Sequence, residues 1–292
     1  MPVFDQGYAP LDEPPRAMSR VWPIYASLVA PAFRRRVVLA ILAMSLTKLG
    51  VQVVLIQFKL SVGKLPFKIA QLPTDSAQGM VQFVTGAGQW GGQWLWVALG
   101  TLVVGAGAIA HDQRTGALRL YFSRPITRGD YALAKCLGVG TFVALVSVVP
   151  GLLLVAFHAL ATKDTVHVDP GGATLPALLA AGALLVALSS LAMVALSALV
   201  RSARVAGIAW LAWLVIGDWV AWRHATPDNP WIQAVSLLRL AGSLGERMLM
   251  DAGAEVRFDV APLDYGTIAL AGSAIATAAM FVIWLRLREV RR

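Results

Sequence analysis

The sequence predicts an all-α, polytopic membrane protein with six transmembrane helices. Of its 292 residues, 58% are hydrophobic and only 14% are charged, and the mean hydropathy is +0.67. A soluble domain of this length cannot bury so much apolar surface, so part of it is expected to face lipid. Six segments have the length of about 20 apolar residues that a helix needs to cross a bilayer. They are residues 37–58, 90–110, 136–157, 175–200, 205–222 and 265–285.

The distribution of Lys and Arg predicts the side of the membrane on which each loop lies. With the N-terminus inside, sixteen of the 25 basic residues fall in inner segments and eight in outer segments. The run Arg34–Arg36 directly precedes the first span. Because basic residues favour the cytoplasmic side, we expect both termini in the cytoplasm and a multi-pass protein of the bacterial inner membrane. The net charge of +9 fits this topology and calls for no nucleic acid.

We divide the chain into a cytoplasmic N-terminal tail, residues 1–20, and a single transmembrane domain, residues 21–292. The tail has no basic region followed by an apolar region, so no cleavable signal peptide is expected. Residues 21–33 are apolar but too short to cross a bilayer. Because Trp22 and Tyr25 suit the depth of the headgroups, this segment is predicted to lie in the inner interface as a helix, with a flexible tail as the alternative.

A basic stretch, HDQRTGALRLYFSRPITRGDYALAK, occupies residues 111–135 between the second and third spans. Within it, Leu118, Tyr121 and Phe122 recur at helical spacing, which predicts one short amphipathic helix that begins at Arg114 and ends at Phe122.

The end of this stretch predicts a turn and a second helix. Pro125 stops the first helix, because the residue before a proline is disfavoured in the α conformation. The hydroxyl of Thr127 is placed to accept a hydrogen bond from the N–H of Asp130, so a new helix is expected to begin near Arg128. Residues 111–135 are thus a short helix, a turn and a capped membrane helix.

This stretch resembles the first cytoplasmic loop of the type-2 ABC transporter permeases, a family with six spans and both ends in the cytoplasm. The family pattern is an acidic residue, a Gly, a small residue and a Leu, followed by Ser-Arg-Pro, a second Arg and a Lys. The acid is usually Glu and the small residue is often Thr, so this chain departs from the pattern at two positions. The corresponding residues are Asp112, Gly116, Ala117, Leu118, Ser123, Arg124, Pro125, Arg128 and Lys135.

The resemblance implies roles for three segments. Residues 113–123 would be the coupling helix that docks on a separate ATPase subunit, and residues 21–33 would be the elbow or connecting helix. Residues 231–250 would form short re-entrant helices on the outer side between spans five and six, with a surface helix on the outer leaflet as an equal alternative. The implied ATPase-coupling residues are Asp112, Arg114, Gly116, Leu118, Tyr121, Phe122, Ser123, Arg124, Pro125, Arg128 and Lys135.

The implied function is that of the transmembrane permease subunit of an ABC transporter. The chain would work as a dimer, or with a homologous permease, above two ATPase subunits that bind ATP and Mg²⁺. The long outer loops leave room for an accessory protein on that face. The chain itself lacks the sequence G-x-x-x-x-G-K-[ST], so we expect neither a P-loop nor enzyme activity in it. Its four histidines lack the spacing of metal ligands, so no metal or bound cofactor is expected.

Two charged residues lie within predicted spans, Lys48 in the first and Asp218 in the fifth. They lie about 17 and about 20 Å from the inner ends of their spans. Because intramembrane charges are usually paired or face a water-filled path, we expect an ion pair or two charges that face one cavity. A secondary carrier that uses both charges for ion coupling is one alternative function. A membrane anchor or assembly factor that transports nothing is another.

Overall fold

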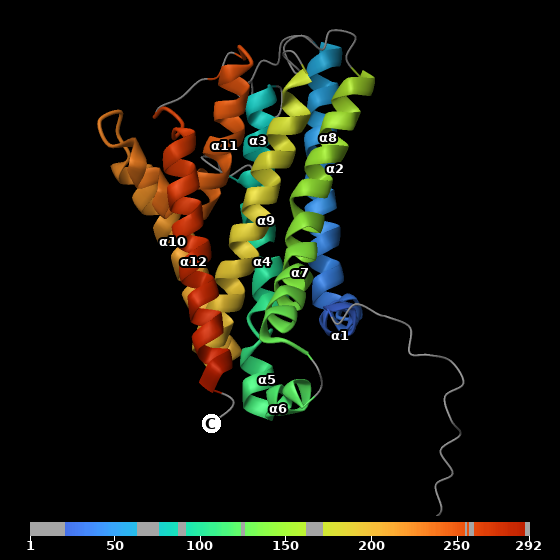
Figure 1. The fold of residues 1–292 in the computed structure, drawn as a ribbon. Coiled ribbons are helices and arrows are strands. Elements are labelled where there is room, and N and C mark those ends of the chain that lie inside the picture. The colour runs from blue at the N-terminus through green and yellow to red at the C-terminus, as the bar shows by residue number, and fades with distance from the viewer. Residues whose placement is uncertain are drawn as a thin grey trace, which may run out of the picture.

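Helices account for all the regular secondary structure in the residues that the computed structural model describes, which are 21–62, 76–86, 92–123, 126–161, 172–254, 256 and 260–289. We call the end of the bundle that carries α1, α5 and α6 the lower end, and the opposite end the upper end (Figure 1). The helices are α1 Val21–Phe33, α2 Arg36–Val62, α3 Ala77–Thr85, α4 Trp94–Gly105, α5 Ala110–Thr115, α6 Ala117–Phe122, α7 Arg128–Val146, α8 Val148–Ala161, α9 Thr174–Leu199, α10 Ala203–His224, η4 Pro230–Val235, α11 Leu237–Asp251 and α12 Tyr265–Glu289.

Six helical segments are long and apolar enough to cross a membrane, which confirms the predicted number of spans. The first, fourth, fifth and sixth lie close to the predicted positions, whereas the second and third differ from them. The predicted tail, residues 1–20, lies outside the described residues. The six segments are Arg36–Phe58, Trp94–Thr115, Arg128–Ala161, Thr174–Leu199, Ala203–His224 and Tyr265–Arg288.

The third pass begins at Arg128, earlier than the predicted segment 136–157, because a capping box starts the helix there. The Thr127 hydroxyl accepts from the N–H of Asp130 at 3.0 Å, and the Asp130 carboxylate accepts from the N–H of Thr127 at 3.1 Å. These bonds satisfy two N–H groups that the first turn of a helix leaves unpaired. The predicted cap is therefore confirmed, and the helix extends beyond the apolar segment.

A break at Ser147 divides the third pass into α7 and α8. Pro150 lies just after the break and has no N–H to donate to the carbonyl of Val146, four residues earlier. The hydroxyl of Ser45 on α2 donates to that carbonyl instead, at 2.9 Å. A polar side chain of the first pass thus satisfies a carbonyl that the proline leaves free in the third.

The second pass differs from the predicted segment 90–110, because α4 begins only at Trp94. The 12 residues of α4 rise about 18 Å, which is short of the hydrocarbon thickness of about 30 Å. Helix α3, in a region predicted as loop, meets the upper end of α4. The N–H of Gln93 donates to the carbonyl of Phe83 in the last turn of α3, at 2.8 Å. Figure 1 shows α3 above α4.

Helix α3 is buried among α8, α9 and α11 because glycines on those helices make room for it. A Cβ atom added at Gly151 of α8 would lie 2.1 Å from a methyl carbon of Val84, and one added at Gly245 of α11 would lie 2.6 Å from a methyl carbon of Val81. Such close approach is what small residues provide in membrane bundles.

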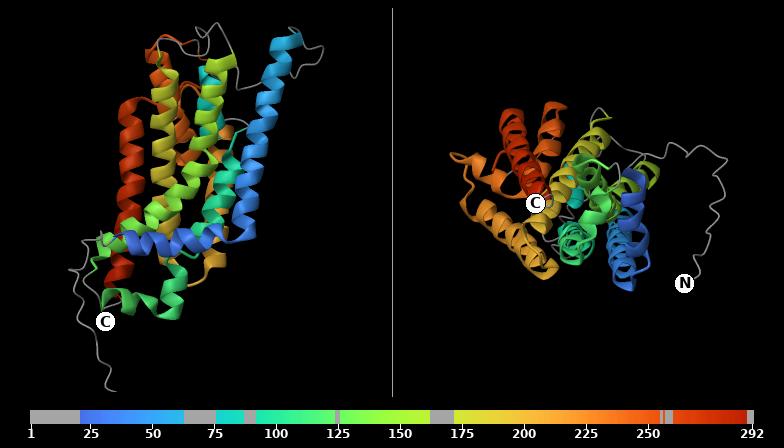
Figure 2. Two further views of the ribbon diagram at one scale, coloured as in Figure 1. Left: turned by 90° about the vertical axis from the view of Figure 1, so that its right-hand side faces the viewer. Right: turned by 60° about the horizontal axis from the view of Figure 1, so that its bottom comes forward.

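Helix α1 runs crosswise to the long helices at the lower end (Figure 2). It packs against α7, where Leu28 lies over Gly138 and the hydroxyl groups of Tyr25 and Thr141 are 3.1 Å apart. Trp22 is exposed and stacks on Tyr25, with ring centroids 5.4 Å apart. A helix in this position, with one exposed aromatic ring, is compatible with the predicted interfacial segment 21–33.

Helix α9 occupies the centre of the bundle and packs against α7, α11, α12 and α3. By contrast, α2 and α12 lie at the edges, with rows of exposed apolar side chains. Helix α11, which overlaps the predicted outer segment 231–250, packs against α9 and α3 and buries Leu238, Leu240 and Leu249. Helices α9 and α3 therefore cover the apolar face of α11.

Candidate functional site

The loop between the second and third passes contains two short helices, α5 and α6, where the sequence predicted one helix over residues 114–122. Gly116 separates them with φ +72°, a left-handed conformation that ends α5. Glycine adopts this conformation without the steric cost that a Cβ atom adds. The expectation of one continuous helix was therefore wrong, and α6 starts in a new direction after Gly116.

Asp112 points into the protein and fastens α5 to α7. Its carboxylate lies 2.8 Å from the ammonium nitrogen of Lys135, and it accepts a hydrogen bond from the hydroxyl of Tyr131 at 2.6 Å. The side chains of Lys135 and Asp112 are 5% and 12% exposed. Two of the residues implied by the resemblance thus form a covered ion pair. Tyr131, the third member, carries no sequence signal that points to this role.

A single hydroxyl group fastens the same loop to α9. The Ser197 hydroxyl accepts from the N–H groups of Ile109 and Ala110, each at 3.0 Å, and donates to the carbonyl of Ala106 at 2.9 Å. These three groups lie at the junction of α4 and α5, where Ala106 follows α4 and Ala110 is the first residue of α5. The side-chain amide of Gln113 also donates to a carbonyl of α9, that of Ala198, at 3.0 Å.

The apolar side chains of the predicted amphipathic stripe face the bundle rather than solvent. Leu118 is buried, and the rings of Tyr121 and Phe122 lie 5.5 and 5.8 Å from the ring of Tyr131. All four belong to one hydrophobic cluster that also includes Ile24 of α1. This stripe therefore holds α6 against α7 and α1.

The opposite side of the loop is exposed, and we call it the outward face: Arg114, Thr115, Arg119 and Leu120. Leu120 is 72% exposed, although it is a large apolar residue in a loop of a folded bundle. Leu120 was not predictable from the sequence, because a lone leucine off the predicted stripe gives no signal.

The remaining residues implied by the resemblance lie after the outward face. Ser123 is exposed, and its hydroxyl donates to the carbonyl of Leu120 at 2.8 Å. Arg128 is partly buried in the first turn of α7. Arg124 and Pro125 lie outside the described residues.

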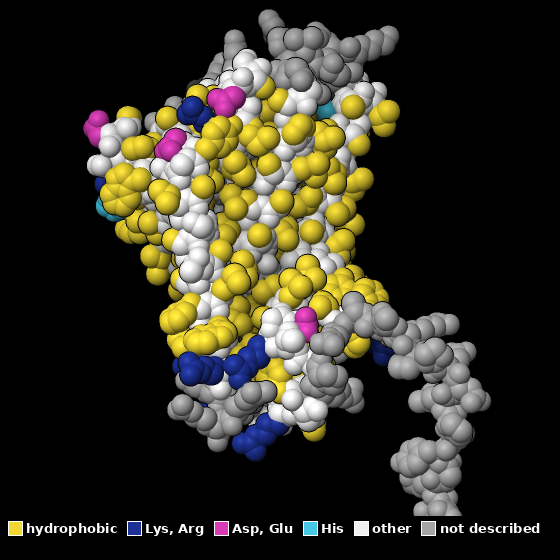
Figure 3. Space-filling view, in the orientation of Figure 1, with side chains coloured by type: hydrophobic (Ala, Val, Ile, Leu, Met, Phe, Trp, Pro, Cys, Tyr) yellow, Lys and Arg dark blue, Asp and Glu magenta, His cyan; other side chains and the backbone are white. Residues whose placement is uncertain are grey.

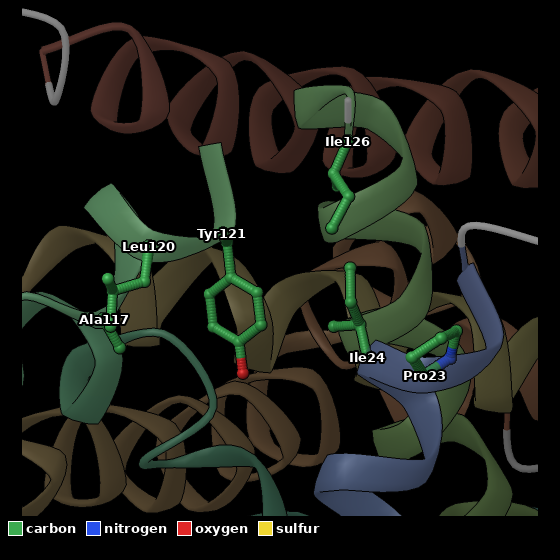
Figure 4. A pocket seen from close by; sticks show the side chains of 6 residues that line it. All are labelled: Pro23, Ile24, Ala117, Leu120, Tyr121 and Ile126. Atoms are coloured by element: carbon green, nitrogen blue, oxygen red, sulfur yellow. The ribbon is translucent and has the colours of Figure 1, made fainter. Parts of the chain in front are cut away.

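A small apolar pocket lies beside the outward face, between α1 and α6. Figure 4 shows two of its side chains on α1, three on α6, and one on the segment that leads into α7. The pocket joins the crosswise helix and the loop into one surface at the lower end. It is lined by Pro23, Ile24, Ala117, Leu120, Tyr121 and Ile126.

Basic side chains gather at this lower end, whereas the side wall is largely apolar (Figure 3). The exposed basic residues there include Arg34, Arg35, Arg114 and Arg119. A belt of apolar side chains above a basic end is the arrangement expected for a protein whose lower end meets anionic headgroups and the cytoplasm.

The two intramembrane charges have separate partners, which corrects the predicted pairing of Lys48 with Asp218. The ammonium group of Lys48 donates to the carbonyl of Gly92. The carboxylate of Asp218 lies 3.2 Å from the guanidinium of Arg239 and accepts from the hydroxyl of Ser236 at 3.1 Å. The packing gives the reason: α2 and α10 both contact α4, but α2 otherwise lies against α7 and α8, whereas α10 lies against α9, η4 and α11. Over the described residues, no group of His, Cys, Asp and Glu side chains suited to a metal ion comes together.

The fold and the loop define a six-pass membrane protein with a helical loop bound tightly to two of its passes. Residues 75–217 match the family model described as ABC-2 family transporter protein, and the match includes the whole loop. The chain is therefore a permease of the ABC-2 type, the membrane subunit of an ABC transporter, as the resemblance of residues 111–135 indicated. Permeases of this family work with an ABC ATPase. Among curated proteins, none matches the sequence.

Proposed function

We propose that this permease couples ATP hydrolysis by a separate ATPase subunit to movement of a substrate across or out of the membrane. The observation that supports this most strongly is the two-sided character of α5 and α6. The outward face offers Arg119 and Leu120 to a partner. The inward side is bound to α7 through Asp112 and to α9 through Ser197.

Force on the outward face would move α7 and α9, the helices to which the loop is bound, together. Asp112 of α5 binds Lys135 of α7, and Tyr121 of α6 packs against Tyr131 of α7. A shift of α6 is therefore expected to move the lower part of α7 with it. The bonds of Ser197 transmit the same shift to α9. Since α9 packs against α3 and α11 at the upper end, the motion reaches the opposite side of the bundle.

In this proposal the lower end faces the cytoplasm of a bacterial cell, and the chain lies in the inner membrane with both termini inside. Two ATPase subunits, which bind ATP and Mg²⁺, sit below a pair of permeases, either two copies of this chain or this chain and a homologue. Helix α1 acts as the connecting helix and α5 with α6 as the coupling element, and η4 with α11 form the outer re-entrant segment. The basic lower end supports this orientation.

The test is copurification of an ATPase with the tagged permease in mild detergent. Leu120→Asp places a charge on the outward face without entering the core, because Leu120 is largely exposed. Leu118→Asp is unsuitable as a docking variant, because Leu118 is buried and the change would disturb the bundle. Thr226→Asp introduces the same charge at an exposed position after α10, at the upper end, and is the matched control.

We expect ATPase activity to copurify with the native chain and with Thr226→Asp, and to be lost with Leu120→Asp. Equal recovery with Leu120→Asp would show that the outward face is not the docking site. If no ATPase accompanies the native chain, the coupling proposal is wrong. If an ATPase copurifies but its activity does not depend on the permease, the chain acts as an anchor.

A further inference from the structure

Lys48 is a cation inside the first pass, and the described residues use only part of its hydrogen-bonding capacity. An ammonium group has three N–H donors. Within the described part of the chain, its one hydrogen-bond partner is the carbonyl of Gly92, which is neutral, and no carboxylate lies within ion-pair distance. A charged group at membrane depth is costly unless it is paired or faces a polar path. Lys48 therefore has capacity for an anion.

The carbonyl that Lys48 binds belongs to an interruption of the second pass. There, α3 ends at Gly86, with φ +73°, and α4 begins at Trp94. Gly92 packs so closely on Gly86 that a Cβ atom at position 92 would lie 2.5 Å from the Cα atom of Gly86. The nine residues of α3 rise about 14 Å and continue the second pass above this interruption. Interrupted helices in membranes are tolerated where protein covers them or where they line a cavity, and in transporters they often form binding sites.

The interruption and Lys48 lie at similar depth. Lys48 follows Arg36, the first residue of α2, by 12 positions, so it lies about 18 Å along α2 from its lower end. The hydrogen bond from Lys48 to Gly92 places the upper end of α4 at the same depth. Polar side chains accompany Lys48 on the same face of α2: Ser45 is one turn before it and Gln52 one turn after it, and both are buried. Ser45 is also within 3.5 Å of the side chain of Gln93, at the start of α4.

Lys48 is reachable from the side of the bundle. It is partly exposed, and α2 is one of the two passes that bury the smallest share of their surface in this chain. Its neighbours on the exposed side of α2 are apolar, including Met44 and Val51. The site thus consists of one cation with polar neighbours, beside the exposed apolar side of α2.

We propose that Lys48, at the interruption of the second pass, binds the anionic headgroup of an amphiphile that approaches from the bilayer. A phosphate or carboxylate oxygen would accept hydrogen bonds from the N–H donors of Lys48 that no described residue uses, while the apolar tail would lie along α2. This inference names the ligand class of the transporter and rests on the proposed function only for whether that ligand is cargo. A resident anionic phospholipid has the same chemistry.

The test measures retention of phosphatidylglycerol by the purified permease. The chain is reconstituted in phosphatidylcholine nanodiscs that contain a minor fraction of phosphatidylglycerol, and lipids that stay bound are counted by native mass spectrometry. We expect Lys48→Met to retain about tenfold less phosphatidylglycerol than the native chain, because the variant cannot make the charge-assisted hydrogen bond to the headgroup. Lys48→Arg keeps the charge and should retain the lipid.

A second control moves the charge without changing its depth. Leu46 is exposed on the opposite side of α2, so Leu46→Lys combined with Lys48→Met restores the net charge away from the interruption. Restored retention in this double variant would overturn the proposal, because it would show general attraction to a cation. Unchanged retention in Lys48→Met alone would also overturn it and leave Lys48 as a structural donor to Gly92.

The binding measurement needs neither ATP nor the ATPase, so it can succeed or fail independently of the docking test. When a copurified ATPase is present, addition of ATP distinguishes the two sources of the ligand. Release of phosphatidylglycerol by the native chain would identify cargo, and retention through hydrolysis would identify a resident lipid. Both results support the site, provided that Lys48→Met lacks the lipid.

Discussion

Asp112 and Lys135 form a covered ion pair at the junction of α5 and α7, and its loss should be measurable. Asp112→Asn leaves the ammonium group of Lys135 buried without a carboxylate, which in comparable cases costs about 3–5 kcal/mol. We expect a clear fall in the thermal denaturation temperature of the purified permease. The double variant Asp112→Asn with Lys135→Met should recover part of the loss. Identical melting of native and Asp112→Asn chains would show that the pair is not coupled to stability.

Glu246 is a second buried acid, and it joins α11 to α3. Its carboxylate oxygen accepts from the side-chain amides of Gln82 at 2.8 Å and Gln78 at 3.4 Å. Burial raises the pKa of Glu246 above its ordinary value of 4.5, and the two amides and the nearby Arg239 only partly oppose this shift. The charged form of Glu246 is therefore disfavoured in the folded protein relative to the unfolded chain.

The raised pKa predicts how Glu246 affects stability as pH changes. Between pH 4.5 and its folded pKa, the folded protein holds a proton that the unfolded chain has released, so stability falls as pH rises through this range. Glu246→Gln removes the titration and keeps an acceptor for both amides. We expect the variant to melt like the native chain near pH 4.5 and at higher temperature at neutral pH. A difference in melting temperature that does not change with pH would contradict this.

At the scale of elements, the attachment of α3 depends on glycines in other helices. Gly245→Ala would bring a Cβ atom to 3.1 Å from the carbonyl oxygen of Ala177 on α9 as well as against Val81 of α3. Because a backbone atom cannot move aside as a flexible side chain does, we expect lower thermal stability. Gly50→Ala on α2 is the control, since no atom lies within 4 Å of its added Cβ and alanine favours helix. Equal melting of the two variants would show that α3 tolerates displacement.

The same elements show how far sequence reasoning reaches. The six passes and the cap at Thr127 were predictable because they depend on local hydropathy and on residues three apart. Helix α3 was not, because nine residues are too short for a span and its burial depends on Gly151 and Gly245, which are distant in sequence. The pairing of Asp112 with Lys135 and the role of Ser197 likewise depend on how passes pack.

At the scale of the whole molecule, one continuous set of contacts joins the two ends of the bundle. The lower loop is bound to α7 and α9, and α9 carries α3 and α11 at the upper end. The interruption of the second pass and Lys48 lie between these ends, where α2 packs against α4. A push on the loop would therefore reach the passes that border the proposed anion site.

The most direct test of docking is a photo-crosslinker placed on the outward face. A photoactivatable amino acid at position 120 is irradiated in native membranes, with the same residue at position 153, on the exposed side of α8, as the control. We expect a covalent product with an ATP-binding protein from position 120 and none from position 153. Labelling of lipid alone from position 120, or the same protein product from both positions, would contradict docking through α6.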